Sequence, residues 1–498
     1  VRLAGGSVAD AAVAASAVLA VTTPHMCGMG GDLFAVVVRP GRRPEVLNAS
    51  GRAGSGADPD RLRADHGTTP PLRDDVRVVT VPGCVDGWLA LHAHHGSLPL
   101  ADVLADAIGY AEDGFPASPL LAATASDVAG RPGTDDLTRR APIRAGDRIR
   151  RPGVARALRA VAAEGRDGFY GGEFGEGLVR LGAGEFVPED LARDQADWVE
   201  PLRLRVWDHD LWTPPPNSQG YLTLSSAWIA QGLPLPAGPD DPGRAHLLVE
   251  ATRQAGHDRP AVLHEHADGA ALLDPDRLAP RRERIDPDRA GDLPAPVAGG
   301  GTIFLAAADH DGNGVALIQS NAAGFGSHLV EPRTGIFLHN RGIGFSLEPG
   351  HPAEYGPGRR PPHTLAPLVA TRPDDGSLHA VVGTMGGDSQ PQVVLQLLAR
   401  LLAAGQDPAT AVAAGRWVLG AGQGPNFGVW RDPAAIRVRV EAHAPPAWTE
   451  GLTARGHRVE PIRAFDHRAG HAHVIVRAED HLAGAADPRA VVGGVAVL

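Results

Sequence analysis

Several residue types are scarce in this chain of 498 residues, and each scarcity excludes a class of protein. Two cysteines, Cys27 and Cys84, are too few for a disulfide framework or a cysteine metal site, although one disulfide between them stays open. Aromatic residues make up 5% of the chain, which offers no stacking platform for nucleic-acid bases. No uninterrupted apolar run reaches the ~18–20 residues of a membrane span. The sequence therefore predicts neither a nucleic-acid-binding protein nor a membrane protein.

Lysine is absent, so all 47 basic residues are arginine. Together with 63 glycines and 44 prolines, this is typical of a GC-rich genome, so the choice of arginine by itself has no functional meaning. The net charge of −11 also argues against polyanionic partners. A chain of this length with 43% hydrophobic residues can bury a large core, and we expect a globular, loop-rich protein.

The first residues lack the pattern of an export signal. The apolar stretch 11–21 follows Asp10, and Arg2 is the one basic residue before it. We therefore expect a cytoplasmic protein, judged from a chain that begins at Val1, almost inside a motif described below.

Hydrophobic periodicity predicts a mixture of helices and strands. The turn at 309–313, of sequence DHDGN, separates two apolar runs and indicates a β-hairpin of residues 303–308 and 314–319. The segment 274–301 is charged and then rich in proline and glycine, as expected of an exposed, mobile linker. Further helices are predicted at 10–21, 87–95, 100–113, 245–254 and 390–404, and further strands at 33–38, 78–81 and 379–384.

Thr302 stands where the glycine-rich end of this linker meets the first strand of the hairpin. A loop followed by an ordinary strand is the simpler explanation of the local pattern. The chemical interpretation is that the Gly301–Thr302 bond breaks, which leaves Thr302 with a free α-amino group beside its hydroxyl. Such an amine has a pKa of about 7.7–8.0 and would take the proton from its own side-chain oxygen. The threonine would then be a nucleophile that contains its own base.

Seven motifs, in order along nearly the whole chain, favour the chemical interpretation. They are GGSVADAAVAASAVLAVTTPHMCGMGGDLFAVVV (5–38), LNASGRA (47–53), TVPGCVDGW (80–88), DHDGNGVALIQSN (309–321), FLHNRGIGFSLEPGHP (337–352), RRPPHTLAP (359–367) and VVGTMGGDSQPQ (381–392). Together they resemble γ-glutamyltranspeptidases, the threonine-dependent branch of the N-terminal-nucleophile hydrolases. The resemblance implies a four-layer αββα sandwich, an α+β fold. It also implies a large-subunit half at 1–301 and a small-subunit half at 302–498, which stay together after self-cleavage.

The resemblance also assigns a catalytic machinery. The nucleophile falls on Thr302, and the cleaved bond joins it to Gly301, where the family more often has a polar residue. A second, supporting hydroxyl falls on Ser320, and the oxyanion hole falls on the backbone N–H groups of Gly386 and Gly387. Losing one such donor typically raises the barrier by about 3–4 kcal/mol. This chemistry needs neither a cofactor nor a metal.

The positions that bind a γ-glutamyl group in the family have changed in this chain. Ser50 stands at the position of the arginine that holds the α-carboxylate, with Arg52 two residues later. Gly344 stands at the position of the aspartate that holds the α-ammonium, and Ala322 replaces an asparagine. A buried charge without its partner costs several kcal/mol, so we expect that glutathione is not the donor.

Other substrate-binding candidates lie in two later motifs. They are Asn340 and Arg341 in the first, and His363 and Thr364, which replace a pair of serines, in the second. Three of the candidates, Arg52, Arg341 and His363, form a hypothetical replacement site for an anion.

The motifs predict a self-processing hydrolase or acyltransferase of a family associated with glutathione metabolism. Its substrate would be a small amide or peptide-like molecule, with water preferred to an amine as acceptor, and its own two fragments would form a heterodimer. A higher oligomer stays open. One alternative is a biosynthetic member that cleaves a non-glutamyl amide, as cephalosporin acylases do, or a C–C bond beside a ketone, as in alkylproline-type pathways. The other alternative is an unprocessed, inactive scaffold.

The run His264-Glu265-His266 is similar to a pair of metal ligands. In the helix expected there, however, side chains at i and i+2 do not face each other. We therefore predict no metal site.

Overall fold

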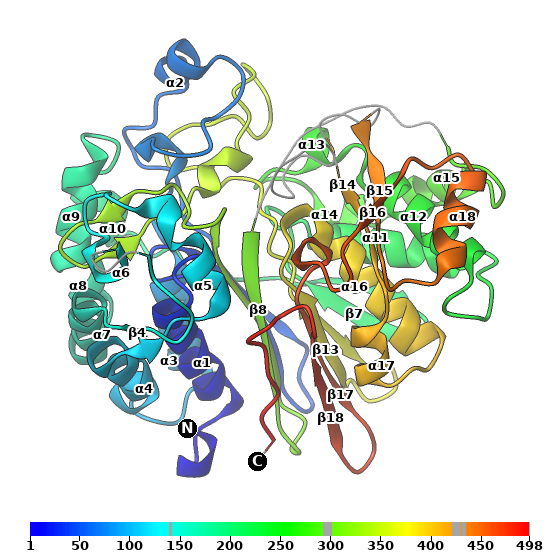
Figure 1. Ribbon diagram of the computed structural model, residues 1–498, viewed down its shortest axis with the longest axis horizontal. Helices are drawn as coiled ribbons and strands as arrows, with labels where there is room; N and C mark the ends of the chain where they lie inside the picture. Colours follow the sequence, from blue (N-terminus) through cyan, green and yellow to red (C-terminus); the bar gives the residue numbers. More distant parts are fainter. Residues whose placement is uncertain (139–141, 292–300, 421–429, 431–434, 498) are drawn as a thin grey trace.

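Two antiparallel sheets form the centre of the molecule (Figure 1). The structure is a computed structural model that describes residues 1–138, 142–291, 301–420, 430 and 435–497, with the backbone alone for Arg2, Gly301 and Thr302. The first sheet has the strand order β5 (Asp197–Val199), β2 (Glu45–Ala49), β1 (Asp32–Val38), β9 (Gly314–Ala322) and β8 (Gly301–Ala308). The second has the order β18 (Leu482–Ala486), β17 (Ala472–Arg477), β13 (Leu378–Thr384), β12 (Leu368–Thr371), β7 (His209–Thr213) and β6 (Leu202–Val206).

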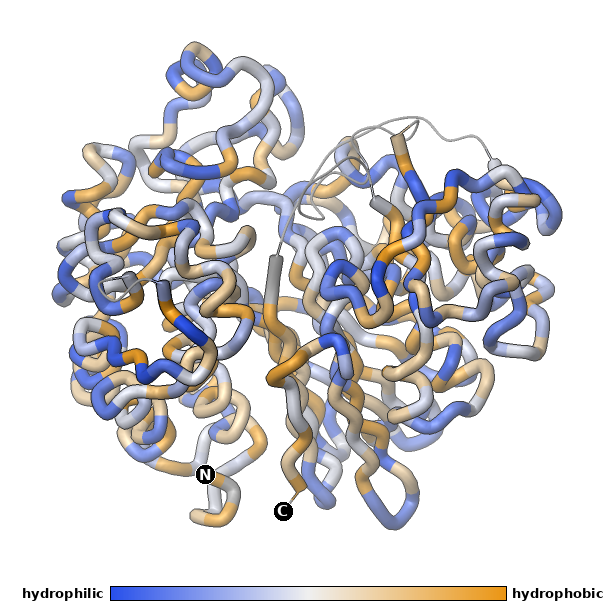
Figure 2. The backbone as a smooth tube through the Cα atoms, viewed as in Figure 1, coloured by the Kyte–Doolittle hydropathy of each residue, from blue (hydrophilic) through white to orange (hydrophobic). Residues whose placement is uncertain are grey.

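The two sheets pack face to face over a buried apolar layer. Phe304 and Ile318 from the first sheet share one cluster with Trp212 and Val381 from the second. Strand β8 contacts both β13 and β17 across this layer. Figure 2 shows the layer as apolar segments that run along the central strands.

Helices cover the outer face of each sheet, which completes the predicted four-layer αββα sandwich. The first sheet is covered by α1 (Val8–Thr22) and α3 (Cys84–His95), and the second by α11 (Gly220–Gln231) and α16 (Gln390–Leu398). More helices pack on these layers: α4 (Leu100–Asp113), α7 (Pro152–Glu164), α8 (Arg166–Tyr170), α9 (Glu173–Gly182), α12 (Pro242–Gly256), α15 (Pro275–Glu283) and α18 (Pro446–Ala454).

Shorter elements connect these layers. A three-stranded sheet contains β14 (Trp417–Gly420), β15 (Arg437–Glu441) and β16 (Val459–Ile462), and two strand pairs are β3 (Phe115–Pro116) with β4 (Arg148–Ile149) and β10 (Val330–Glu331) with β11 (Ile336–Phe337). The short helices are η1 (Arg2–Ala4), α2 (Pro59–His66), η2 (Val76–Val78), α5 (Pro119–Thr124), η3 (Ala125–Val128), α6 (Asp135–Thr138), α10 (Pro188–Ala192), α13 (Arg259–Val262), α14 (Gly269–Leu272), η4 (Arg341–Gly344), η5 (Gly387–Ser389), η6 (Ala399–Ala403), α17 (Pro408–Ala413) and η8 (His467–Ala469).

Local sequence explains the elements that position the site. Ser7 and Asp10 form a capping box at the start of α1, in which each side chain accepts from the backbone N–H of the other residue. Strand β1 is buried along its whole length between a helix layer and the second sheet, which explains its continuous apolar run. In the β8–β9 turn, the Asp309 carboxylate accepts from the backbone N–H of Asn313 at 3.0 Å, and Gly312 has a φ of 91° that favours glycine.

Each sheet takes strands from both sides of the predicted cleavage point. In the first sheet β1, β2 and β5 precede Thr302, whereas β9 follows it and β8 contains it. In the second sheet β6 and β7 precede it and the other four strands follow. Residues 1–301 and 302–498 therefore interleave in one body, and their separation by cleavage stays a prediction.

Three local predictions are wrong in part, and a fourth, the helix at 264–266, is wrong throughout. Residues 78–81, predicted as a strand, end η2 and continue as a loop, because the Val81 N–H donates to the carbonyl of Arg52 in another loop. The predicted linker 274–301 contains α15, which begins where the Asp274 carboxylate accepts from the backbone N–H of Asp276, and its residues 292–300 lie outside the described residues. The predicted helix 390–404 ends at Leu398 and continues as the π-helical η6.

Two motifs that suggested metal or disulfide chemistry make different contacts in the structure. Residues 264–266 form a turn and not the expected helix, and the Glu265 carboxylate accepts from Arg359 Nε at 3.0 Å. Cys27 and Cys84 are free, buried thiols that contact the two ends of the Gln319 amide. Burial raises the pKa of Cys27 to about 12. The disulfide that the sequence left open is therefore not formed.

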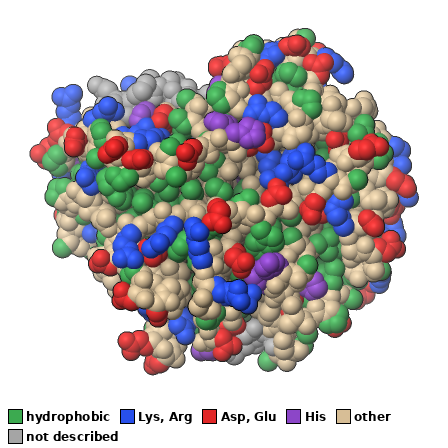
Figure 3. Space-filling view, turned by 180° about the vertical axis from the view of Figure 1, so that it is seen from behind, with side chains coloured by type: hydrophobic (Ala, Val, Ile, Leu, Met, Phe, Trp, Pro, Cys, Tyr) green, Lys and Arg blue, Asp and Glu red, His purple; other side chains and the backbone are tan. Residues whose placement is uncertain are grey.

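Charges of both signs share the surface. Figure 3 shows acidic and arginine side chains interspersed over one face of the molecule. A bilayer-spanning length of apolar residues occurs in none of the helices that the structure describes.

Gly383 of β13 leaves room for the Phe304 ring of the opposite sheet. A Cβ on Gly383 would lie 2.4 Å from that ring. Gly383→Ala should therefore lower the free energy of unfolding by about 1–3 kcal/mol through overpacking, as measured by urea unfolding.

The matched control is Gly109→Ala, at an open position of α4, which should leave stability unchanged or raise it by about 0.5–1 kcal/mol. Adding Phe304→Leu to Gly383→Ala should recover part of the loss. An unchanged stability in Gly383→Ala would contradict close packing of the two sheets.

Candidate functional site

The β8–β9 hairpin brings two predicted catalytic residues together. The register of these strands shifts at one place: Gly301 pairs with Ala322, whereas Ile303 pairs with Gln319. The backbone of Thr302 therefore lies opposite residues 320–321. Ser320 is fully buried there, and its hydroxyl accepts from the backbone N–H of Ala322 at 2.8 Å.

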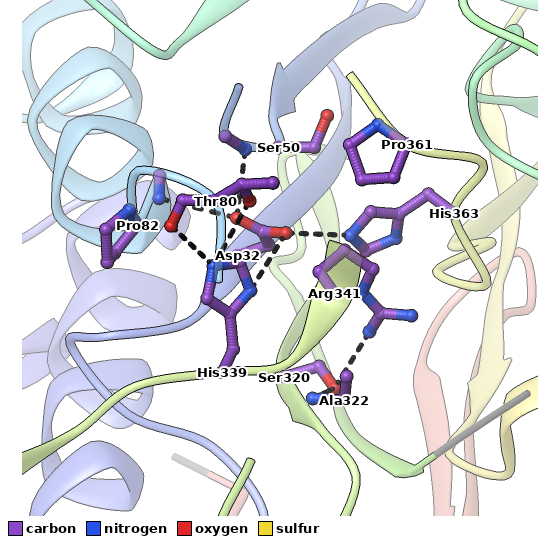
Figure 4. A network of polar contacts seen from close by, with 12 residues as sticks. Asp32, Ser50, Thr80, Pro82, Ser320, Ala322, His339, Arg341, Pro361 and His363 are labelled. Atoms are coloured by element: carbon purple, nitrogen blue, oxygen red, sulfur yellow. Dashed lines mark hydrogen bonds and ion pairs between the residues drawn. The ribbon is translucent and has the colours of Figure 1, made fainter. Parts of the chain in front are cut away.

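Arg341, the first residue of η4, lies next to Ser320 and is 1% exposed. Its Nη2 donates to Ser320 Oγ at 3.3 Å, and its Nη1 donates to Thr364 Oγ1 at 2.9 Å (Figure 4). Its Nε has no hydrogen-bond partner among the residues that the structure describes. Burial lowers the pKa of Arg341 to about 10, so the guanidinium keeps its charge at neutral pH.

The carboxylate of Asp32, at the start of β1, is the centre of the adjoining network (Figure 4). Its Oδ1 accepts from the backbone N–H groups of Gly51 at 3.0 Å and Gly83 at 3.4 Å. Its Oδ2 accepts from His363 Nε2 at 3.0 Å and lies 3.4 Å from His339 Nδ1. Burial would raise the pKa of Asp32, but the two histidines outweigh it and hold the pKa well below its usual range. Asp32 is therefore ionised.

His363 is a neutral imidazole in this network. Its Nδ1 accepts from the backbone N–H of Leu365 at 3.2 Å, which leaves the proton on Nε2, where it is donated to Asp32. Burial, followed by the nearby Arg341 charge, lowers the pKa of His363 to about 3. An uncharged ring whose proton is already donated to a carboxylate does not attract an anion.

Among the described residues, no contact joins Arg52 to Asp32, His363 or Arg341. Its Nη2 pairs with Asp197 Oδ2 at 2.8 Å, and its Nη1 donates to the carbonyl of Asp194. The predicted anion site of three residues therefore does not assemble: Arg52 and His363 have carboxylate partners of their own, and Arg341 remains.

Ser50 belongs to a buried polar cluster beside Asp32. Its hydroxyl donates to Asn48 Oδ1 at 2.7 Å and accepts from Asn217 Nδ2 at 3.2 Å. Its carbonyl accepts from Arg360 Nε at 2.7 Å, and Arg360 also pairs with Asp197 at 2.7 Å. These contacts hold the Ser50 loop in place.

Asn340 and Gly344 shape the loop around Arg341. Asn340 Oδ1 accepts from the backbone N–H of Ala323 at 3.0 Å, and its Nδ2 donates to the carbonyl of Leu72 at 2.7 Å. A Cβ on Gly344 would lie 2.4 Å from the carbonyl oxygen of Pro362. The backbone packing thus leaves no room for an aspartate at this position.

Gly386 and Gly387 form the turn after β13. Their φ angles of 137° and 59° favour glycine, and neither backbone N–H donates to another residue in the described part of the chain. Gln219 Nε2 donates to the carbonyl of Gly387 at 2.8 Å and to that of Thr364 at 2.9 Å. Gln219 therefore connects the glycine turn to the hydroxyl residue that contacts Arg341.

Sequence reasoning missed four residues of this site. Asp32 had a weak signal, as an acidic residue directly before a buried apolar strand, and His339, Arg360 and Gln219 had none. Their partners lie far away in the sequence, so only the fold brings them together.

In the part of the chain that the structure describes, one further group of potential metal ligands lies on β2 and α3. Ligand-type atoms of Glu45, His94 and His95 lie within 4.8 Å of one another. Both histidine rings pack against Trp198, with ring centroids 4.9 and 5.4 Å away. The sequence analysis did not identify this group.

A family model described as gamma-glutamyltranspeptidase matches residues 2–497. The chain is 37% identical to an oxamate amidohydrolase proenzyme of Klebsiella pneumoniae over 97% of this chain and 93% of that protein. It is 34% identical to a glutathione hydrolase-like YwrD proenzyme of Bacillus subtilis, again over 97% and 93%. The crystal structure of a cephalosporin acylase from Bacillus halodurans superposes with a TM-score of 0.89 at 32% identity, over 99% of this chain and 92% of that one.

Replacement of His363 should change how stability depends on pH. The His363 pKa is about 3 when folded and about 6.5 when unfolded, so the unfolded chain takes up the extra proton as the pH falls below 6.5. His363 therefore destabilises the fold progressively from pH 6.5 towards pH 3. His363→Gln should be less stable than the wild type at pH 7, and this deficit should shrink by about 2 kcal/mol at pH 5.

Urea unfolding at pH 8, 7 and 5 measures the difference. Between pH 8 and 7 the deficit should stay nearly constant. A deficit that grows on acidification would show that His363 is charged in the folded protein.

Proposed function

This chain belongs to the gamma-glutamyltranspeptidase family, and from that premise we propose that it is a self-processing amide hydrolase with Thr302 as its nucleophile. The observation that supports the proposal is the β8–β9 register, in which the backbone of Thr302 lies opposite residues 320–321. Relatives named as an amidohydrolase and an acylase, both over most of this chain, support hydrolysis of an amide bond.

Self-processing breaks the peptide bond between Gly301 and Thr302. The Thr302 hydroxyl attacks the Gly301 carbonyl carbon, the peptide nitrogen leaves with a proton as an amine, and an ester joins the two residues. Water then hydrolyses the ester, which yields a carboxylate on Gly301 and restores the Thr302 hydroxyl. Ser320 is the polar side chain on the neighbouring strand that would hold this hydroxyl in place.

Turnover repeats the same chemistry on a substrate. The α-amine of Thr302 takes the hydroxyl proton while the oxygen attacks the substrate carbonyl, and the proton then passes to the leaving amine. The N–H groups of Gly386 and Gly387 would stabilise the oxyanion. They are available for this role because neither donates to an acceptor in the described structure. Water resolves the acyl-enzyme and regenerates Thr302. No step requires a cofactor.

The surroundings of the site argue against a γ-glutamyl donor. The Ser50 hydroxyl is engaged by two asparagines, and Gly344 leaves no room for an acidic side chain. A zwitterionic head group would therefore leave charges unpaired, at a cost of several kcal/mol. We propose that hydrolysis dominates over transfer and that glutathione is a poor substrate.

A second candidate function is deacylation of a larger non-glutamyl amide. The likeness to the cephalosporin acylase, at a TM-score of 0.89, favours this candidate. The catalytic steps would be the same, and the two candidates differ in the size of the acyl group.

Thr302→Ala should abolish both self-cleavage and amide hydrolysis. Wild-type protein should give two bands on a denaturing gel, and N-terminal sequencing of the smaller fragment should begin at Thr302. Thr302→Ala should give one full-length band, whereas the matched control Thr302→Ser, which keeps a hydroxyl, should still be cleaved. Cleavage of Thr302→Ala at the same bond would exclude Thr302 as the nucleophile.

The processed enzyme should hydrolyse γ-glutamyl anilide poorly. Losing charge partners at both ends of the amino-acid head group should lower kcat/KM by about 100-fold or more relative to a preferred amide. Release of aniline or ammonia measures the two rates. Efficient γ-glutamyl turnover would contradict the roles given to Ser50 and Gly344 but not the assignment of Thr302.

A further inference from the structure

We infer that Arg341 binds a carboxylate on the acyl part of the substrate, so that the preferred substrates are short amides with a carboxylate next to the scissile carbonyl or one carbon away from it. This inference rests on the proposed function, because it takes the Thr302 hydroxyl as the attacking atom. It deepens that function by naming the substrate class.

Arg341 differs from the other fully buried arginines in its partners. Arg151 pairs with Asp136 at 3.1 Å and Arg416 with Asp487 at 2.6 Å. Arg341 contacts two neutral hydroxyls, and no described carboxylate lies within ion-pair distance of it. A buried charge without a counter-ion is strongly unfavourable, so the site is suited to an anion that arrives from outside.

The nearest acidic residues are committed elsewhere. Asp32 influences Arg341 electrostatically, but its oxygens accept from two backbone N–H groups and from His363. Asp388 also acts on Arg341 at a distance and lies 3.8 Å from Arg259. The neutral His363 adds no charge to the site. The positive charge on Arg341 therefore has no contacting anion in the described structure.

The Nε–Nη2 edge of the guanidinium is only partly engaged and has the geometry that binds a carboxylate. Nη1 is occupied by Thr364, whereas Nε has no partner and Nη2 makes a longer bond of 3.3 Å to Ser320. Nε–H and the adjacent Nη2–H project in parallel from one edge of the planar group, and this edge binds both oxygens of a carboxylate at once. Figure 4 shows the guanidinium between His363 and Ser320.

The position of Arg341 limits the length of the acyl group. Its Nη2 contacts Ser320, one of the two residues that lie opposite the backbone of Thr302 in the hairpin. Thr364, which accepts from Arg341, is joined through Gln219 to Gly387 of the oxyanion turn. A carboxylate at Arg341 and a carbonyl at Thr302 are therefore separated by few bonds. The three carbons between the carbonyl and the carboxylate of a γ-glutamyl group exceed this spacing.

The test compares amides of increasing length with the processed enzyme. Ammonia release is measured with oxamate, malonamate, succinamate and glutaramate, and with oxamide as the neutral counterpart of oxamate. We expect kcat/KM to be highest for oxamate or malonamate, to fall with each carbon added beyond malonamate, and to be about 100-fold lower for oxamide than for oxamate.

Arg341→Gln removes the charge and keeps a side chain that can donate a hydrogen bond. It should lower kcat/KM for the carboxylate amides by about 100-fold and change that for oxamide by less than about tenfold. Arg244→Gln is the matched control, because Arg244 is also buried, at 3% exposed, but donates to the carbonyls of Pro236 and Ala399. It should lower thermal stability and leave the ratio of the two substrates unchanged.

A binding measurement covers the case in which Arg341→Gln no longer processes itself. Malonate should raise the midpoint of thermal unfolding of the Arg244→Gln protein and should not raise that of Arg341→Gln. The inference is overturned if processed wild type prefers oxamide, or if malonate stabilises Arg341→Gln equally. Failure of the proposed function looks different, because wild type would then remain uncleaved or Thr302→Ala would keep its activity.

Discussion

The buried carboxylate of Asp32 is the interaction on which the geometry of the site depends. It accepts from the backbone of Gly51 and Gly83, accepts from His363 and faces His339, so that one anion joins five segments of the chain. Three of these segments precede Thr302 and two follow it. An ionised carboxylate without its donors is costly in a protein interior, so each segment is held where it solvates this charge. The positions of the surrounding loops therefore follow from the solvation of a single charge.

The same network separates two roles that charged residues have in the site. Asp32 is saturated with protein donors and serves the structure, and His363 is kept neutral between Asp32 and Leu365. Arg341 is next to both, but it is left with hydroxyl partners. If Asp32 had fewer backbone donors, it would pair with Arg341 as its counter-ion. Arg341 would then no longer attract an anion from outside. The backbone and histidine donors that satisfy Asp32 thus leave Arg341 without a counter-ion. The contacts that stabilise the fold therefore also determine how the site binds an anion.

The sequence predicted the sandwich through the family resemblance carried by its ordered motifs, and the β8–β9 hairpin through local periodicity. It thereby placed Thr302 and Ser320 on the two paired strands of that hairpin, while their catalytic roles stay a prediction. It did not predict the Asp32 network, whose members His363 and Asp32 are 331 positions apart in the chain. It grouped Arg52 and His363 with Arg341 as anion-binding residues, because residue type alone does not show that Arg52 and His363 already have carboxylate partners. It also missed α15, although Asp274 followed by proline is a helix-start signal, because the surrounding composition indicated a linker. Partners that are distant in sequence were the common cause of error at the site.

The interleaving of strands in both sheets has a thermodynamic consequence if the proposed cleavage of the Gly301–Thr302 bond takes place. The paired strands would still hold the two fragments together, yet the denatured state would be two independent molecules with more translational freedom. Refolding then becomes a second-order process that slows on dilution, whereas an intact precursor refolds at a rate that does not depend on concentration. Cleavage would thus make unfolding difficult to reverse. The intact chain can unfold and refold by itself, whereas the cleaved protein remains functional only as long as its two fragments stay folded together.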